Sequence, residues 1–540
     1  MKKKIIVRIM LISAMCVLSA CSSGRRANGS AVETQAESAV EAAAESTVET
    51  VAGSSGQPTQ IAGEQVSEAG EQTSVPALYP VVTKEYRSVP SDDGTAALVT
   101  GTYPQVTLKN AGYEKLAAAL DSWNEEVKTM VEQLITESAV AAKEELEYDM
   151  PLGVDTHLPY IEESDAVIMR ADENVFSIRR GSYSYTGGAH GMYSVFCSNF
   201  DSATGKELSL DDVISDKSAL CEEILQTLNE TYDKETFFEG YEQSVKDEVF
   251  GKERDSYTME LSWSLEADGI TVYFMQYDLA PYSAGLLTVK ILYNGNEAMF
   301  ADGAIFESQT RVIPVSLFQK EYVEVNGTYE ELYLNQSFDT GSEYEKKIQV
   351  RLGDSEVAAA ADYGIAAAYL IRKEAGQNWL YVETLSDNDY RVLKVFDLSQ
   401  TTPVYKGHFE GGSFYDNVPS DPDDFLLSTR MSLLSTYYAE RAYRIGEDGM
   451  PEAMEETYTS DAMELTAKVD IVAFSGENMD EACVIPKGSI VTIVGTDNET
   501  WVDLKDSGET VYRVYVDGGW PQRIDGTDID DCFEGIVFAG

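Results

Sequence analysis

The chain has 540 residues, and its composition excludes one class of partner. It carries 93 acidic and 40 basic side chains, which gives a formal net charge of −53. Because so acidic a surface repels phosphate backbones, we expect no nucleic-acid partner. The same charge favours cationic partners such as Ca²⁺, polyamines or basic proteins, or it serves only to keep the protein soluble.

The N-terminus predicts export from the cytoplasm. It reads MKKKIIVRIMLISAMCVLSAC, in which a basic start precedes an apolar run over residues 9–20 that is short for a membrane span. The closing letters LSAC resemble the lipobox of bacterial lipoproteins. This resemblance implies a signal peptide over residues 1–20 and a diacylglyceryl group on Cys21; the alternative is an ordinary signal peptide. We expect a protein that is lipid-anchored on the extracytoplasmic face of the cell membrane.

Residues 21–77 have the composition of a disordered tether. They contain no aromatic residue and are rich in Ala, Glu, Ser and Gly. Such a segment cannot bury enough apolar surface to offset the entropy lost on ordering. The remaining length suits about three domains, which we place at residues 78–300, 301–455 and 460–540.

Residues 78–300 are expected to form an α+β domain with two helices and an antiparallel sheet. A second helix is expected over residues 216–232. Hairpins are expected to turn at residues 172–174 and at Asp268-Gly269. The first helix is predicted by apolar residues at helical spacing, which would share one buried face: Leu116, Leu120, Trp123, Val127, Met130, Val131 and Leu134.

Two blocks of this region carry a family resemblance. The first, SYTGGAHG, and the second, YDLAPYSAG, flank the segment FDSATGKELSLDDVI. Together they resemble an extracytoplasmic domain family that includes the lysozyme-sensing domain of RsiV-type anti-sigma factors and the wall-associated region of PdaC-type peptidoglycan deacetylases. The resemblance implies an outer-surface recognition domain. It implies neither sigma-factor control nor deacetylation, because the sequence motifs for those activities have no counterpart here.

The two blocks supply the candidate ligand-binding residues. Their aromatic side chains belong either to the core or to an exposed platform for a sugar or a protein partner. His190 is either a structural residue in a tight turn, a ligand contact or a general base; the G-x-S-x-G pattern of a nucleophile turn is absent. The candidates are Tyr185, Gly187, Gly188, His190, Gly191, Tyr277, Pro281, Tyr282 and Gly285.

The cysteines and histidines predict structure rather than metal chemistry. In a secreted protein, the even number of downstream cysteines suggests a Cys483–Cys532 disulfide and a Cys197–Cys221 disulfide. The three histidines, His157, His190 and His408, follow no metal-ligand spacing, and the acidic segment DGTDIDDCFEG lacks the EF-hand spacing. We therefore expect no metal and no cofactor, and we interpret His408 as structural.

The rest of the chain is predicted to be rich in strands. Residues 301–455 suggest a β-sandwich or a partial sheet, in which residues 358–373, AAAADYGIAAAYLIRK, form a strand or a helix. Residues 460–540 hold short strands separated by turns such as Lys487-Gly488, and they resemble a bacterial SH3-like barrel. This resemblance implies a wall-associated module.

These patterns favour a non-catalytic binding protein over an enzyme. Its expected partner is a cell-wall-related ligand, either the cationic protein lysozyme or peptidoglycan. One alternative is a wall hydrolase or transferase that uses His190 as its base. Another is a structural surface protein without a small-molecule site.

Overall fold

The computed structural model describes residues 77–538 with short internal gaps. The predicted signal peptide, the predicted lipidation site Cys21 and nearly all of the predicted tether lie outside the described residues, as does His157. Within the described ranges, no helix combines the length and the apolar character needed to cross a bilayer. The gaps are residues 93, 95–96, 110, 150–158, 255–256, 259, 306–309, 318, 339–345, 362, 374–375 and 461–462.

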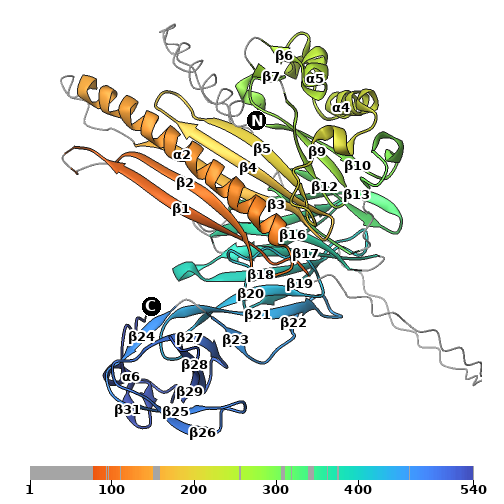
Figure 1. Cartoon of the computed structure of the whole chain (residues 1–540). Helices are drawn as coiled ribbons and strands as arrows, with labels where there is room; N and C mark the ends of the chain where they lie inside the picture. Colours follow the sequence, from red (N-terminus) through yellow and green to blue (C-terminus); the bar gives the residue numbers. More distant parts are fainter. Residues whose placement is uncertain are drawn as a thin grey trace, which may run out of the picture. The chain divides into compact units, whose positions relative to one another are not determined.

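A five-stranded sheet and one long helix begin the described chain (Figure 1). The strand order is β1-β2-β3-β4-β5; β2 and β3 are parallel and the other neighbours are antiparallel. Because parallel neighbours need a crossover connection, the chain passes from β2 to β3 through α2. The bounds are β1 Pro80–Pro90, β2 Ala97–Leu108, α2 Glu114–Asp149, β3 Tyr160–Ala171, β4 Val175–Tyr185 and β5 Met192–Asp201.

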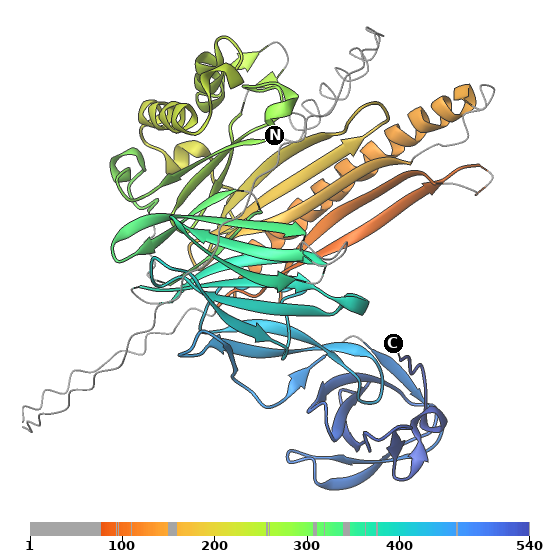
Figure 2. The ribbon, with the colours of Figure 1, turned by 180° about the vertical axis from the view of Figure 1, so that it is seen from behind.

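Helix α2 packs against β2 and β3 and confirms the first predicted helix. Leu116, Leu120 and Val131 on its inner face are buried, and burial of each such side chain stabilises the fold by about 1.5–3 kcal/mol. The Asn124 amide pairs with both backbone groups of Val106 at 2.9 Å. The helix therefore covers one face of the sheet, and Figure 2 shows the sheet from the other side.

Three helices and a three-stranded sheet follow, which is compatible with the predicted α+β class, and α4 confirms the second predicted helix. The parallel β2–β3 pair differs from the antiparallel sheet that was expected. The strand order is β10-β9-β8, and the predicted hairpin at Asp268-Gly269 joins β8 to β9. Asp216 caps α4 by accepting bonds from the amides of Ser218 and Ala219. One apolar cluster unites helices and sheet. The bounds are α3 Leu210–Val213, α4 Lys217–Thr231, α5 Tyr241–Val249, β6 Glu253–Arg254, β7 Tyr257–Thr258, β8 Ser262–Leu265, β9 Gly269–Phe274 and β10 Leu287–Leu292.

Two antiparallel sheets occupy the middle of the chain and share one apolar cluster. Their orders are β11-β16-β17-β18-β19 and β12-β13-β14-β15. Residues 358–373, for which a strand or a helix was expected, contribute to strands β15 and β16. The bounds are β11 Arg311–Pro314, β12 Lys320–Val325, β13 Thr328–Phe338, β14 Lys346–Leu352, β15 Ser355–Ala361, β16 Gly364–Lys373, β17 Gln377–Leu385, β18 Arg391–Asp397 and β19 Val404–Phe409.

The last strands form one sheet of eleven strands in the described residues. Its path runs β20-β21-β23-β27-β28-β29-β25-β26, and β22, β24 and β32 pair beside it. The strand order in this described region is an open path that does not close into a barrel, so the SH3-like barrel stays a prediction. The bounds are β20 Phe425–Met431, β21 Tyr437–Ile445, β22 Pro451–Ala453, β23 Tyr458–Thr459, β24 Glu464–Ala467, β25 Ile471–Ser475, β26 Glu481–Ile485, β27 Ile490–Thr496, β28 Trp501–Asp506, β29 Val511–Tyr515, β30 Arg523–Ile524, β31 Thr527–Asp528, α6 Ile529–Cys532 and β32 Phe533–Glu534.

A buried charge cluster joins the β9–β10 sheet to β12. The Lys290 ammonium lies 3.0 Å from Glu266, 3.2 Å from Asp268 and 2.5 Å from Glu321. All four side chains are at most 9% exposed. Burial is the main reason why the pKa of Glu321 is raised to about 7. The nearby charge of Lys290 lowers this pKa, whereas the carboxylates Glu266 and Asp268 raise it.

The two predicted disulfides are absent, because all four cysteines are free thiols in the structure. Cys197 lies on β5 and faces the Ser262 hydroxyl at 3.9 Å, whereas Cys221 is buried in α4 among its apolar neighbours. Cys483 lies on β26, and Cys532 is buried at the end of α6. An even count of cysteines did not determine which thiols the fold brings within bonding distance.

Candidate functional site

The two sequence blocks occupy two neighbouring turns of the structure. The first block is the turn between β4 and β5, after Tyr185 ends β4. The second block is the loop between β9 and β10, which contains the short 3-10 helix Tyr282–Ala284. A hydrogen bond links the segments next to these turns: the Tyr193 amide donates to the Gln276 side chain at 3.2 Å. Residues about 90 positions apart are thus neighbours in space.

The rings of the two blocks meet on the protein surface. The His190 and Tyr282 rings stack with centroids 3.7 Å apart and an interplanar angle of 22°. The Tyr282 hydroxyl donates to the Gly191 carbonyl at 2.9 Å, and the Tyr277 ring lies 6.1 Å from that of Tyr282. We call His190, Tyr277 and Tyr282 the aromatic platform. His190 and Tyr277 are exposed, so these rings are not core residues.

The backbone holds Tyr277 in a conformation that few side chains adopt. Its φ is 72°, in the left-handed region, and its side chain is 51% exposed. The Asp278 carboxylate accepts from the Met275 amide at 2.7 Å, and the Tyr277 amide donates to Ala280 at 3.1 Å. Such a conformation costs about 1–3 kcal/mol and often marks functional sites. The local bonds therefore keep an aromatic ring in solvent at an energetic cost.

The glycines of both blocks shape the turns. Gly187 and Gly188 have φ of 86° and 89°, which lets the chain reverse, and the Tyr185 hydroxyl closes the turn on the Gly188 carbonyl at 3.2 Å. Gly191 has a steric role instead, since a Cβ there would lie 2.5 Å from the Tyr183 ring. Gly285, with φ 72° and ψ −153°, ends the 3-10 helix that Pro281 precedes.

The surroundings of His190 bear on its possible chemistry. Its ring is exposed, and its Nδ1 lies 3.2 Å from the Gly191 carbonyl. Within the described residues, no hydrogen bond or ion pair joins this ring to a carboxylate or a hydroxyl group. The imidazole is therefore placed as a stacking surface beside Tyr282 rather than oriented by an acid.

A groove crosses the sheet face opposite α2, next to the platform. Its volume is about 210 Å³. The sequence prediction missed this groove, although alternate strand positions such as Glu163 and Asp165 could have indicated one shared face. Its lining comes from all five strands of the sheet: Lys84, Tyr86, Thr102, Glu163, Ser164, Asp165, Gly181, Tyr183 and Tyr193.

The groove floor is a packed arrangement of Asp165, Gly181 and Tyr193. The Asp165 carboxylate accepts from the Gly181 amide at 3.1 Å. A Cβ on Gly181 would lie 2.5 Å from that carboxylate and closer still to the Tyr193 hydroxyl. Burial and then the Asp165 charge raise the pKa of Tyr193, so this phenol stays protonated and can donate a hydrogen bond.

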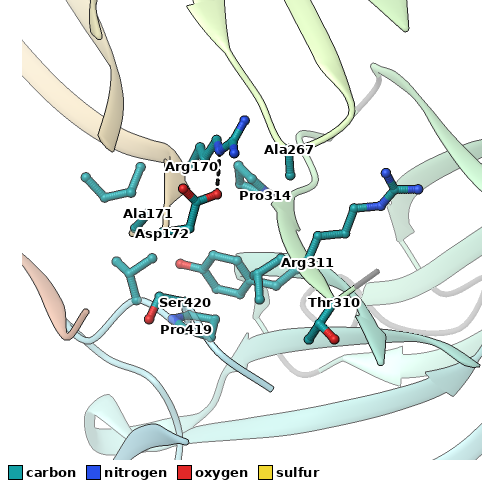
Figure 3. A pocket seen from close by; sticks show the side chains of 13 residues that line it. Arg170, Ala171, Asp172, Ala267, Thr310, Arg311, Pro314, Pro419 and Ser420 are labelled. Atoms are coloured by element: carbon teal, nitrogen blue, oxygen red, sulfur yellow. Dashed lines mark hydrogen bonds and ion pairs between the residues drawn. The ribbon is translucent and has the colours of Figure 1, made fainter. Parts of the chain in front are cut away.

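A second cavity is too small for an organic ligand. It has a volume of about 30 Å³ and is lined by residues of β3, β11 and the segment 418–420 (Figure 3). Arg170 and Asp172 form an ion pair at 2.5 Å in its wall, and the Arg170 guanidinium also donates to the Glu266 carbonyl. The size and polar wall suit one ordered water.

Comparison with known proteins places both blocks within matched regions. Residues 92–193 match the family described as deacetylase PdaC, and residues 211–294 match a protein family of unknown function, DUF3298. These matches confirm the resemblance expected for residues 78–300. The first block lies in the PdaC match and the second in the DUF3298 match, so the platform forms where the two matched regions meet.

Two solved structures are similar to part of the chain. A DUF3298 family member from Bacteroides fragilis is 22% identical and covers 42% of this chain and 95% of its own, with a TM-score of 0.33. A DUF3298 family protein from Pseudomonas aeruginosa is 18% identical and covers 43% of this chain and 99% of its own, with a TM-score of 0.29. No curated protein matches the chain.

Proposed function

We propose that this chain, in which a PdaC-matching region adjoins a DUF3298 domain, is a non-catalytic extracytoplasmic binding protein. Its ligand is related to the cell wall, either lysozyme or peptidoglycan. The observation that carries the proposal is the meeting of His190, Tyr277 and Tyr282 on one exposed surface. Exposed, rigidly held aromatic rings supply contact area at little cost in conformational entropy, which is why they mark recognition surfaces.

The charge of the chain supports lysozyme as one of the two ligands. A net charge of −53 steers a basic protein toward the surface, and this attraction weakens as salt screens it. The platform rings support peptidoglycan, because the apolar face of a sugar ring packs on an aromatic side chain. The absence of an acid partner for His190 among the described contacts supports a binding role over a catalytic one.

A retention assay tests the proposal. The purified full chain in detergent micelles is mixed at low salt with insoluble peptidoglycan or with immobilised lysozyme. We expect one of the two to retain the protein, and Tyr277→Ala to weaken retention at least tenfold. Tyr390→Ala is the matched control, since Tyr390 is 48% exposed in the middle region and Tyr277 is 51% exposed. Equal retention of both variants, or no retention of the native chain, would refute the proposal.

The non-catalytic part needs its own experiment. Native protein and His190→Ala are incubated with peptidoglycan, and released fragments are measured. We expect no release from either. Release that disappears in His190→Ala would instead support the alternative of a wall hydrolase with this imidazole as its base.

The anchor and the C-terminal module complete the proposal. We expect Cys21 to carry the lipid, so Cys21→Ser should release the protein from membranes into the soluble fraction. We also propose that the strands after residue 460 act as an SH3-like wall contact. In support, Trp520 is 78% exposed and its ring lies 5.2 Å from that of Phe538. Trp520→Ala should lower retention on peptidoglycan but not on lysozyme.

A further inference from the structure

We propose that the groove on the open face of the β1–β5 sheet is a second subsite, which binds one uncharged sugar ring of a glycan. The groove is separate from the platform residues and has no assigned role. The inference rests on the proposed function only for the source of the glycan, the cell wall. Its volume of about 210 Å³ is below that of most drug-sized pockets and suits a single ring.

The lining supplies the contacts that a sugar ring needs. Tyr86, Tyr183 and Tyr193 contribute aromatic surface from β1, β4 and β5. Aromatic faces pack on the carbon-bound hydrogens of a sugar, and phenol hydroxyls add polar contacts. Glu163 and Asp165 accept hydrogen bonds from sugar hydroxyls, whereas the Lys84 ammonium donates to them.

The charges of the groove argue against a charged ligand. Lys84 would repel a cation, and Glu163 with Asp165 would repel an anion. Arg179, half-buried on the same face, lies close enough to Asp165 for the two charges to interact. The groove contains charges of both signs, so a charged ligand would lose its hydration and still lie beside a like charge. Binding of a neutral polar ligand is therefore favoured.

The groove floor is fixed before any ligand arrives. The Gly181 amide holds the Asp165 carboxylate at 3.1 Å, and the missing side chain at Gly181 leaves the space that the Tyr193 hydroxyl and this carboxylate border. Preorganised polar groups lose little entropy on binding. The Tyr183 ring packs under Gly191, where it links the groove to the turn that carries His190.

Titration of the full chain with chitotetraose, a neutral tetramer of N-acetylglucosamine, tests the inference by calorimetry. We expect measurable binding that changes little with salt, because the ligand carries no charge. Tyr86→Ala and Glu163→Gln should each weaken it at least fivefold. Both side chains are exposed, so neither change should unfold the protein.

Two matched variants serve as controls. Glu85→Gln alters an exposed glutamate on the same strand as Tyr86, but on the α2 side of the sheet, where Glu85 pairs with Arg87; it should leave affinity unchanged. Tyr390→Ala controls for the loss of an exposed tyrosine. Absence of chitotetraose binding to the native chain, or equal affinity of the groove variants and the controls, would overturn the inference.

The inference and the proposed function can fail separately. If Tyr277→Ala abolishes retention by wall material while the groove variants bind chitotetraose as the native chain does, the function stands and the groove subsite is wrong. If Glu163→Gln weakens the binding of lysozyme or trilysine and chitotetraose does not bind, the groove binds a cationic side chain of a protein partner, and the sugar assignment is wrong.

Discussion

A lysine among carboxylates occurs in two regions of this molecule, and burial gives the two regions different roles. Around Lys290, three carboxylates and the ammonium are all buried and face one another. In the groove, Lys84 and Glu163 are exposed to solvent, and Asp165 is half-buried. Similar residue types therefore form internal ion pairs in one region, whereas in the other region they are accessible to a ligand.

The difference has a physical cause. A buried charge must find its partner inside the protein, because desolvation costs several kcal/mol per ion. The Lys290 cluster meets this need by joining the β9–β10 sheet to β12. Charges in an open groove keep their hydration and contribute little to stability. They can exchange bound water for a ligand, which the buried cluster cannot do.

The largest expected effect is on the buried lysine. Lys290→Met leaves three buried carboxylates without their ammonium, and breaking such a cluster costs about 3–5 kcal/mol of unfolding free energy. Urea unfolding of the full chain at pH 8, followed by circular dichroism, measures it. A loss of unfolding free energy below about 1 kcal/mol would show that the cluster is more hydrated than its burial indicates. The proposed difference between the buried cluster and the groove would then be wrong.

The next effect is a dependence on pH. Glu321 has a pKa raised from 4.5 to about 7 in the folded state. Between these values the folded state keeps a proton that the unfolded state has lost, so the stabilising contribution present at low pH is lost as pH rises toward about 7. Glu321→Gln should remove this component, on the order of 1–3 kcal/mol. The free energy of unfolding is measured for the native chain and for Glu321→Gln at pH 5 and pH 8. Relative to the native chain, the variant should be more stable at pH 8 than at pH 5. The same difference at both pH values would contradict the raised pKa of Glu321.

A pair of glycine variants probes the link between platform and groove. Gly191→Ala forces a Cβ to within 2.5 Å of the Tyr183 ring, and overpacking of this kind costs about 1–3 kcal/mol. Gly188→Ala meets no atom within 4 Å and only strains a φ of 89°, which costs about 1–2 kcal/mol. Thermal melts and chitotetraose titration should both be affected more by Gly191→Ala. The reverse order would separate the turn from the groove.

The smallest expected effect is on the exposed lysine. Lys84→Met removes a charge that faces solvent, so the unfolding free energy should change by no more than about 0.5 kcal/mol. It is the matched control for Lys290→Met under the same urea conditions. A loss comparable to that of Lys290→Met would mean that the groove charges also hold the fold together.

The local elements were predictable because their signals are local. The apolar spacing from Leu116 to Val131 predicted α2, and Asp268-Gly269 predicted the hairpin that joins β8 to β9. The aromatic and glycine residues of the two blocks were also found from the sequence, which placed His190 and Tyr282 among the candidates. Each of these signals needs only a few neighbouring residues, because the backbone conformation itself is a local property.

The groove and the buried cluster were not predictable in this way. The groove takes its walls from five strands, and Lys84 and Tyr193 line one groove only because the parallel β2–β3 pair sets the strand order. The disulfide prediction was wrong for the same reason, because the number of cysteines does not determine which thiols come within bonding distance. Long-range pairing is decided by packing of the whole sheet rather than by any single segment.

The sequence alone therefore predicted α2 and α4, the hairpins at residues 172–174 and 268–269, the acidity and the two aromatic blocks. Only the tertiary structure decided that the blocks meet, that Tyr277 faces solvent and that one lysine is buried while the other is open. The reason is that burial and proximity depend on how faces of distant strands are covered. Periodicity predicts which residues share a face, but only packing determines whether another layer covers that face.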